Sequence, residues 1–276
     1  MQHGRQFFRS SRTLLMGILN VTPDSFSDGG RYRSAEAAVG RGLEMVREGA
    51  DFIDVGGEST RPGAAPVSES VETRRVLPVV EGLVKRAGVP VSIDTRKPAV
   101  ARRCLEAGAG IVNDVGGLRE PGMAETAADH GAAVVVMHMR GTPSTMQSDT
   151  SYADVVSEVT RYLERQAGLA RRAGIREVAV DPGLGFGKTA QQNFRLLAGL
   201  RGIGEAGYPV LIGPSRKSFL GSLTSGLPVS ERLEGTLAAV AAGVMNGAQI
   251  VRVHDVGPCR RLLDVLDAVS EAADAR

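Results

Sequence analysis

The sequence is poor in the residues that would mark it as a disulfide-rich or metal-clustered chain. Tryptophan is absent, aromatic residues make up 4% of the 276 positions, and the only two cysteines are Cys104 and Cys259. Both fall in helical patterns, and the paired Cys and His spacings of metal sites are missing. Because stable disulfides belong to oxidising compartments, we expect two free thiols in a cytoplasmic protein.

The chain also lacks the features of a membrane protein, a secreted protein or a nucleic-acid-binding protein. No apolar run approaches the roughly 20 residues that span a bilayer. The net charge of +2 is too small to indicate nucleic acid or an anionic membrane as a partner. The beginning, MQHGRQFFRSSRT, is charged but has no apolar core of the signal-peptide kind. We expect about residues 1–12 to form a surface extension.

What the sequence does contain is a regular alternation of short apolar runs and longer helical patterns. The runs are rich in Val and Ile and apolar on both faces, as buried parallel strands are. We predict strands at Leu14–Val21, Asp51–Gly57, Val89–Thr95, Gly110–Val115, Ala132–His138, Glu177–Gly183, Tyr208–Gly213 and Gln249–Val256.

Helical spacing fills the intervals between these runs. We predict helices at Ser34–Ala50, Ser68–Arg86, Pro98–Ala107, Pro121–His130, Tyr152–Ala173, Gln191–Ala206, Ser230–Asn246 and Pro258–Ala273. Eight strand–helix units in about 250 residues predict a single-domain TIM (β/α)8 barrel over residues 1–276. A doubly wound sheet is the alternative, but the G-x-G-x-x-G turn of its dinucleotide-binding members is absent.

Polar side chains gather where the predicted strands end. They are Asn20, Glu58, Asp94, Asn113, Asp114, His138, Asp181, Ser215, Lys217, Arg252 and His254. In a barrel these ends share one mouth, where the sites of this fold lie. A lone Asp at such an end is more often a helix cap, and we interpret Asp114 and Asp255 in that way. Caps alone do not explain Lys217, Arg252 and His254 on the same face.

The polar group divides into two halves. Asp94, Asn113, Asp181 and Lys217 offer donors and acceptors that suit a flat heterocycle with amide-like and guanidine-like edges. The alternative for the two aspartates is a buried structural ion pair.

The second half is cationic. Arg61, Arg252 and His254 would bind an anion, with Thr60 beside them. Asn20 offers a neutral oxygen for Mg²⁺, which prefers few protein ligands and keeps several waters.

Together these stretches resemble the dihydropteroate synthases. The matching motifs are GILNVTPDSFSDGG, IDVGGESTRPGA, VSIDT, NDV, VVMH, DPGLGFGKT, GPSRKSFLG, RLEGTLAA and VRVHDV, in the family's order. The resemblance implies a barrel, commonly a homodimer, that uses Mg²⁺. It implies condensation of (7,8-dihydropterin-6-yl)methyl diphosphate with 4-aminobenzoate, giving 7,8-dihydropteroate and diphosphate, in folate biosynthesis and under sulfonamide inhibition.

By this resemblance each residue acquires an expected role. Pterin contacts are expected from Asp94, Asn113, Asp181 and Lys217, with Met137 and Phe186 as apolar walls. The diphosphate is expected to meet Asn20, Thr60, Arg61, Arg252 and His254, with Asn20 also meeting Mg²⁺. Aminobenzoate is expected near Ser218, Phe26 and Pro62. Asp94, Lys217, Arg252, His254 and Arg61 are the expected catalytic residues.

The loop after the first strand carries one more expectation. In this family it is mobile and closes over the reacting groups, so Phe26 would cover the aminobenzoate ring and exclude water. The hard step is expulsion of diphosphate, for which an electron-rich dihydropterin favours a carbocation-like path stabilised by Asp94.

Three alternatives remain open from the sequence. A pterin-binding methyltransferase shares the barrel and the Asp/Asn pocket, but would not need STRPGA or SRKSFLG. A non-catalytic paralogue is expected to have lost Arg61, Lys217, Arg252 or His254, and all four are present. A sugar-phosphate barrel enzyme would not explain Asp94, Asn113 and Asp181 together.

Overall fold

The computed structural model describes residues 6–22, 31–61, 63–222 and 226–274. Its strands are β1 (Leu14–Asn20), β2 (Phe52–Gly56), β3 (Val91–Asp94), β4 (Ile111–Asp114), β5 (Ala133–Met137), β6 (Val178–Asp181), β7 (Leu211–Ile212) and β8 (Ile250–Val253). Its helices are α1 (Arg31–Arg47), α2 (Glu69–Arg86), α3 (Pro98–Glu106), α4 (Met123–Asp129), α5 (Val155–Arg172), α6 (Ala190–Ala198), α7 (Leu200–Gly204), α8 (Ser218–Gly221), α9 (Leu233–Met245) and α10 (Val256–Asp274), with a 3₁₀ turn at Val229–Glu231.

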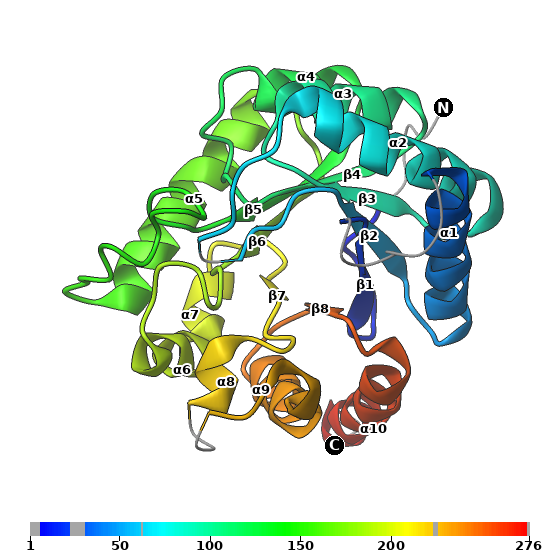
Figure 1. The fold of residues 1–276 in the computed structure, drawn as a ribbon. Helices are drawn as coiled ribbons and strands as arrows, with labels where there is room; N and C mark the ends of the chain where they lie inside the picture. The colour runs from blue at the N-terminus through cyan, green and yellow to red at the C-terminus, as the bar shows by residue number, and fades with distance from the viewer. Residues whose placement is uncertain (1–5, 23–30, 62, 223–225, 275–276) are drawn as a thin grey trace.

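The strands form one parallel sheet that curls into a barrel, with the helices around it (Figure 1). The strand order is β6-β5-β4-β3-β2-β1-β8-β7. A parallel bridge between Val180 and Val210 joins the two ends of this order. The predicted (β/α)8 barrel is therefore confirmed, and the doubly wound alternative is wrong, because an open sheet would not close upon itself.

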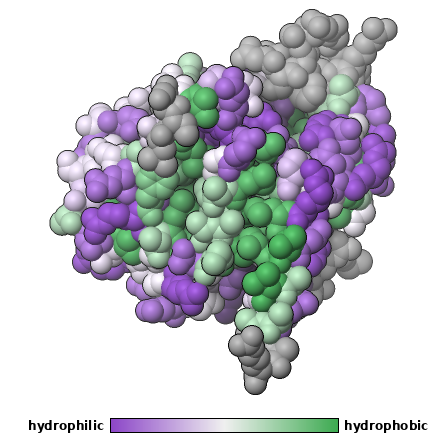
Figure 2. Space-filling model, turned by 90° about the horizontal axis from the view of Figure 1, so that it is seen from below, coloured by the Kyte–Doolittle hydropathy of each residue, from purple (hydrophilic) through white to green (hydrophobic). Residues whose placement is uncertain are grey.

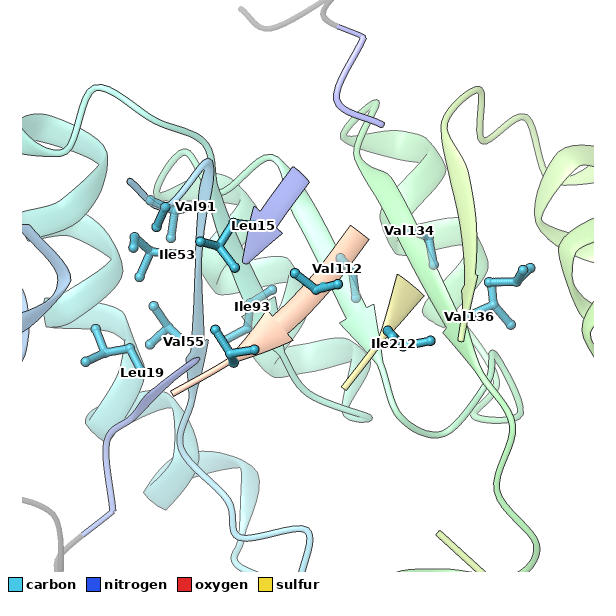
Figure 3. Packing of buried hydrophobic residues seen from close by; sticks show 14 of the residues in the cluster. Leu15, Leu19, Ile53, Val55, Val91, Ile93, Val112, Val134, Val136 and Ile212 are labelled. Carbon is cyan, nitrogen blue, oxygen red and sulfur yellow. The ribbon is translucent and has the colours of Figure 1, made fainter. Parts of the chain in front are cut away.

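The outward-facing strand residues pack against the helices. Figure 3 shows Val, Ile and Leu side chains projecting from successive strands into the surrounding layer. Full burial of each such side chain contributes about 1.5–3 kcal/mol. Because both faces of the sheet are covered, the strands read as nearly continuous apolar runs, which is why the sequence located them.

Side-chain caps define where several helices begin. The Ser68 hydroxyl accepts the Val71 N–H at the start of α2, and Asp154 accepts two N–H groups at the start of α5. Thr189 and Gln192 form a reciprocal capping box at the start of α6. Each cap satisfies amide groups that the first helical turn leaves unpaired and contributes about 1 kcal/mol.

The expected surface extension is only partly at the surface: among its described residues, Gln6 and residues 9–12 are exposed, but two phenylalanines are not. Phe7 and Phe8 are buried, and the Phe8 ring meets Phe52 edge-on with centroids 6.3 Å apart. They join the inward-facing side chains at the amino-terminal end of the barrel, namely Leu14, Met16, Phe52, Ile111, Ala133, Val135, Ala179, Leu211 and Ile250. The two phenylalanines thus plug the barrel base, where their burial removes apolar surface from water.

Two local expectations were also wrong. The helix predicted over Gln191–Ala206 is divided at Gly199 into α6 and α7. Asp114 is no helix cap: its two oxygens accept the N–H groups of Gly116 and Leu118, each at 2.7 Å. It shapes the turn after β4, while α4 begins only after Gly122.

Asp255 forms a bidentate ion pair with Arg216, at 3.0 and 2.5 Å. Its carboxylate therefore links the loop after β7 to the end of β8, a contact between segments far apart in the chain. Among the described residues, no helix has the length and apolarity needed to cross a lipid bilayer.

Candidate active site

A polar layer lies above the apolar base of the barrel. Side chains alternate between the two faces of a strand, so residues two apart share a face. Phe52, Ile111 and Ile250 face the barrel interior near its base. Counting two residues toward the mouth from each gives Asp54, Asn113 and Arg252, and the same alternation from Ala179 gives Asp181. The inward face of these strands is therefore apolar near the base of the barrel and polar two residues nearer the mouth.

Three of these side chains, Asp54, Asn113 and Arg252, are joined by hydrogen bonds to one another and to Asp94 at the end of β3. The Arg252 guanidinium donates from Nε to Asp54 Oδ2 and from Nη2 to Asp94 Oδ2, both at 2.6 Å. The Asn113 amide donates from Nδ2 to the same Asp54 oxygen at 2.9 Å. These residues come from β2, β3, β4 and β8, so the contacts tie together strands on both sides of β1. The sequence alternative of a buried ion pair is thus real for Asp94, and the pair lies within the predicted site.

The charges in this group oppose one another. Burial raises the pKa of Asp94 to about 7, since Asp54 adds to the effect of burial while Arg252 opposes it. Burial acts to lower the pKa of Arg252, but Asp54 and Asp94 outweigh it and raise that pKa. Arg252 therefore stays cationic, and Asp94 is held close to gaining a proton near neutral pH.

Lys217 and Asp181 face the same mouth. The Lys217 ammonium lies 3.8 Å from the centroid of the Phe186 ring, a cation–π contact. Burial lowers the pKa of Lys217 to about 8, with Arg252 acting in the same direction and Asp181 against it. Burial raises the pKa of Asp181 to about 6 even though its Oδ1 accepts the Gly183 N–H at 2.7 Å.

An apolar wall stands beside these groups. Met137 and Phe186, both predicted as walls, are buried and pack in one cluster with Val115, Met139 and Met146. Flat faces of this kind accommodate an aromatic ring, and methionine adapts to its outline. The Lys217 contact places a cation at the edge of this wall.

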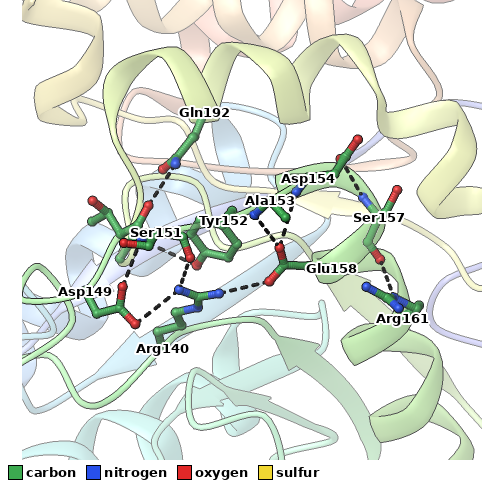
Figure 4. Close-up of polar contacts among 12 residues, drawn as sticks. Arg140, Asp149, Ser151, Tyr152, Ala153, Asp154, Ser157, Glu158, Arg161 and Gln192 are labelled. Atoms are coloured by element: carbon green, nitrogen blue, oxygen red, sulfur yellow. Dashed lines mark hydrogen bonds and ion pairs between the residues drawn. The ribbon is translucent and has the colours of Figure 1, made fainter.

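The loop that supplies part of the wall is held by a polar network (Figure 4). Arg140 lies 3.8 Å from the centroid of the Tyr152 ring and forms ion pairs with Asp149 and Glu158. The Tyr152 hydroxyl donates to the Gly187 carbonyl at 3.1 Å. The network therefore couples the loop after β5 to the loop that carries Phe186.

Lys188 fastens the same two loops from inside. Its side chain is buried, and its ammonium donates to the carbonyl oxygens of His138, Gly183 and Phe186 at 3.4, 3.0 and 2.9 Å. Burial lowers its pKa to about 7. This lysine joins the backbone after β5 to the loop that follows Asp181, and the sequence did not indicate it.

His254 does not fit its predicted role as a cation. Burial lowers the pKa of His254 to about 3, and Arg252 and Arg216 act in the same direction. Its ring Nδ1 lies 3.0 Å from the Ser215 hydroxyl, which also accepts the His254 backbone N–H at 3.1 Å. Without a bound anion these effects favour the neutral imidazole, which offers a hydrogen bond.

The predicted anion-binding loop follows β2. Thr60 is half-buried and Arg61 is exposed, and the Arg61 charge is near enough to lower the pKa of Lys217. Glu58 anchors the loop, since it accepts the Val67 N–H at 3.0 Å and the Lys97 ammonium at 2.8 Å. The loop that carries Arg61 is thus anchored beside the mouth through Glu58.

The predicted aminobenzoate residues are only partly described. Ser218 is exposed at the first position of α8, directly after Lys217. Phe26, with the whole loop Pro23–Gly30, and Pro62 lie outside the described residues. The predictions for Phe26, Pro62 and the covering loop therefore stay predictions.

The end of β1 offers one oxygen suited to Mg²⁺. A Cβ placed on Gly56 would lie 3.7 Å from Asn20 Oδ1 and 3.6 Å from Asp94 Oδ2, so both oxygens line one small space. Among the described residues no three His, Cys, Asp or Glu side chains gather to hold a metal ion. The donor set fits an ion that takes most ligands from water and substrate.

Asp54 is the principal site residue that the sequence reasoning missed. Only the last residues of each strand were considered, and Asp54 lies two positions before the end of β2. The available signal was a charged residue inside an apolar strand, on the same face as Gly56. A buried charge of that kind needs a partner, and a barrel interior supplies one.

The fold and this layer of side chains define a barrel enzyme for a flat polar heterocycle. A family model described as pterin-binding enzyme matches residues 16–254. The Escherichia coli K12 dihydropteroate synthase is 48% identical over 262 residues, covering 94% of this chain and 93% of that protein. The chain belongs to the pterin-binding enzymes and, within them, to the dihydropteroate synthases.

Solved structures agree with this assignment. A Xanthomonas albilineans dihydropteroate synthase with 4-aminobenzoic acid matches with a TM-score of 0.88 and 48% identity, over 94% of this chain and 93% of that one. A Yersinia pestis dihydropteroate synthase in complex with a sulfonamide drug matches with a TM-score of 0.89 and 44% identity, over 95% of each chain. The alternatives of a methyltransferase and a sugar-phosphate enzyme lose their support.

The charges in the mouth predict a bell-shaped pH profile for kcat/KM of the pterin substrate. Activity should fall below about pH 7, where Asp94 gains a proton, and above about pH 8, where Lys217 loses one. Steady-state rates between pH 5 and 10 measure both limbs.

The Lys217→Arg variant is the matched control for this profile. A guanidinium keeps its proton throughout, so the part of the alkaline limb that belongs to Lys217 should disappear, while any part due to Lys188 and the acid limb stay. Ionisation of the substrate diphosphate is common to both enzymes and cancels in the comparison. An alkaline limb that is the same in both proteins would contradict the assignment to Lys217.

Proposed function

We propose that this mouth performs the dihydropteroate synthase reaction with the residues predicted from the sequence, in a cytoplasmic homodimer that uses Mg²⁺. The reaction joins (7,8-dihydropterin-6-yl)methyl diphosphate to 4-aminobenzoate and releases diphosphate. The carrying observation is the convergence of Asp94, Asn113, Asp181 and Lys217 on one mouth beside an apolar wall. The two buried free thiols, Cys104 and Cys259, suit a reducing compartment.

The pterin would lie between the wall and the polar layer. Met137 and Phe186 would contact its faces, while Asp94, Asn113 and Asp181 would meet its edges. Carboxylates accept paired N–H groups such as those of an aminopyrimidinone. The Lys217 ammonium, held over the face of the Phe186 ring, would donate to a ring carbonyl or nitrogen of the pterin. Because these few groups are fixed in place, binding would also hold the pterin in the orientation that the reaction needs.

The diphosphate would lie toward the outer part of the mouth. Arg61 and Thr60 approach it from the loop after β2, and His254 offers a neutral hydrogen bond from the end of β8. Arg252 uses Nε and Nη2 on the two carboxylates, and within the described residues Nη1 has no such bond. These groups would stabilise charge that develops on the leaving oxygen.

The bond changes require no enzyme nucleophile. The C–O bond to diphosphate breaks, positive charge spreads from the exocyclic methylene into the dihydropterin, and the arylamine nitrogen then bonds to that carbon and loses a proton. Asp94 would stabilise the transient cation electrostatically. Aminobenzoate would bind near Ser218, whose hydroxyl suits its carboxylate, with Phe26 and Pro62 as its further expected contacts.

A comparison of Asp181→Asn with wild type tests the function and the pterin pocket together. In an assay that follows dihydropteroate and diphosphate, wild type should form both from the two substrates. The variant should lose about 10–100-fold in kcat/KM for the pterin diphosphate, the range expected for a charged hydrogen bond. The KM for aminobenzoate should stay within about twofold.

Asp264→Asn is the matched control for that comparison. Asp264 is an exposed residue of α10 that pairs with Arg260. It should leave both kinetic constants unchanged. Absence of turnover in wild type, together with methyl transfer from methyltetrahydrofolate, would overturn the function in favour of the methyltransferase alternative.

Mg²⁺ is proposed on the chemistry of Asn20 and the diphosphate. When bound, the ion would supply charge neutralisation at the leaving group. Asn20 would hold it through Oδ1, with the remaining ligands coming from water and phosphate oxygens.

Calorimetry checks the metal independently of turnover. Mg²⁺ should bind measurably only when diphosphate is present, and Asn20→Ala should weaken that binding by about tenfold, the loss expected for one hydrogen-bond-sized contact. Equal Mg²⁺ affinity in wild type and variant would remove Asn20 from the metal site.

The homodimer is proposed on an apolar face formed by α9 and α10. Figure 2 views the molecule from this side and shows hydrophobic residues gathered there. Met245, Val265 and Val269 are 66%, 62% and 63% exposed. Val265 and Val269 are four residues apart, so they share one helix face. A self-complementary patch of this kind suits a second copy of the chain.

Placing charge on this face should separate the subunits. The double variant Val265→Glu/Val269→Glu should sediment as a monomer where wild type sediments as a dimer, because two carboxylates would be buried without partners. The control is Leu169→Glu, which adds charge at an exposed leucine of α5. A wild-type monomer at micromolar concentration would contradict the dimer.

A further inference from the structure

Asp54 lies beneath the pterin residues without reaching the mouth itself. Its side chain is fully buried in β2, and its Oδ2 accepts hydrogen bonds from both Asn113 and Arg252. We propose that Asp54 is the positioning residue of the pterin pocket: its carboxylate fixes the amide orientation of Asn113 and the plane of the Arg252 guanidinium. This inference rests on the function proposed above.

The first part of the argument concerns the amide of Asn113. An ionised carboxylate can only accept hydrogen bonds, so the neighbouring amide must turn its NH₂ group toward Asp54. The observed Nδ2–Oδ2 distance of 2.9 Å agrees with that orientation. Oδ1 is then the Asn113 atom left for a ligand, and the residue presents an acceptor to the pterin. Asp54 thereby determines that Asn113 accepts a hydrogen bond from a donor group of the pterin.

The second part concerns Arg252. The guanidinium is planar, and two donors on different nitrogens are held by carboxylates from two strands. Contacts of 2.6 Å to Asp54 and Asp94 leave the plane no freedom to rotate. The remaining nitrogen, Nη1, is therefore aimed by the other two. Without Asp54 the guanidinium would keep only its contact to Asp94.

The third part concerns charge. Two carboxylates share one guanidinium, and Asp54 Oδ1 and Asp94 Oδ1 are buried with no hydrogen-bond partner in the described residues. Burying such oxygens is unfavourable for folding. The arrangement is instead suited to a site in which positive charge develops on the bound ligand, since the excess negative charge stabilises it.

The Asp54→Asn variant tests the proposal at nearly constant volume. An asparagine at this position can donate as well as accept, so it no longer fixes the Asn113 amide. The expected result is a fall of at least tenfold in kcat/KM for the pterin diphosphate, the loss of one charged hydrogen bond. The KM for aminobenzoate should change by less than about twofold.

The pH profile distinguishes positioning from a merely structural role. Arg252, Asp54, Glu72 and Lys217 are the charged groups that act on Asp94, and the Asp54 charge raises the Asp94 pKa. Removal of that charge should move the acid limb of the kcat/KM profile to lower pH. Loss of packing alone would reduce the amount of folded enzyme and leave the limb where it is.

Asp51→Asn is the matched control. Asp51 directly precedes β2 at its opposite end, where it pairs with Arg12 and accepts the Leu15 N–H at 2.9 Å. The same substitution there should leave the pterin kcat/KM and the acid limb unchanged. The proposal is overturned if Asp54→Asn matches wild type, or if it weakens both substrates equally with an unmoved limb.

A second measurement uses the wild-type chain in case Asp54→Asn does not fold. The ¹⁵N side-chain amide of Asn113, assigned by its absence in Asn113→Ser, should carry one slowly exchanging proton before any ligand is added. A freely exchanging amide would overturn the proposal. Calorimetric binding of the pterin diphosphate separates the two claims, because a wild type that binds it without turnover would refute the proposed function while leaving Asp54 testable.

Discussion

The site depends on one buried cluster of charges, in which the guanidinium of Arg252 forms ion pairs with both Asp54 and Asp94. An isolated charge in a barrel interior is strongly unfavourable, so each member of the group requires the others. Their mutual attraction connects β8 to β2 and β3 across β1, and the amide of Asn113 extends the group to β4. Asp54, Asp94, Asn113 and Arg252 are thus held in one electrostatic unit built from four strands.

The barrel makes this unit possible because it separates an apolar base from a polar mouth. Inward-facing residues near the base pack with Phe7 and Phe8, which exclude water from below. Two positions further along the strands, the same face carries Asp54, Asn113 and Arg252. In such a low-dielectric surrounding, each charge affects its neighbours strongly, which is why the pKa values of Asp94 and Lys217 approach neutrality from opposite sides.

Much of this could be predicted from the sequence, for identifiable reasons. Strands that are buried on both faces appear in the sequence as apolar runs, so their positions could be predicted. The polar residues at their carboxyl ends indicated a site at one mouth of the barrel. The charge of His254 could not be read from the sequence, because it depends on burial and on Arg252 and Arg216 beside it. Phe7 and Phe8 were wrongly placed at the surface, since an isolated FF pair in a charged segment carries no periodicity. Asp54 and Lys188 were missed because neither stands at the end of a strand.

The sequence by itself determined the barrel, the number and order of its strands, and the set of residues at their ends, because the alternation of side chains and the motif order are local properties of the chain. Only the tertiary structure decided which of those residues contact one another. Asp54 and Arg252 are 198 positions apart, and the bond between them exists because β8 and β2 lie on either side of β1 and closure of the sheet turns both side chains into one interior. Protonation states, amide orientation and the direction of the guanidinium follow from that closure, since each depends on charges that are distant in the chain and adjacent in space.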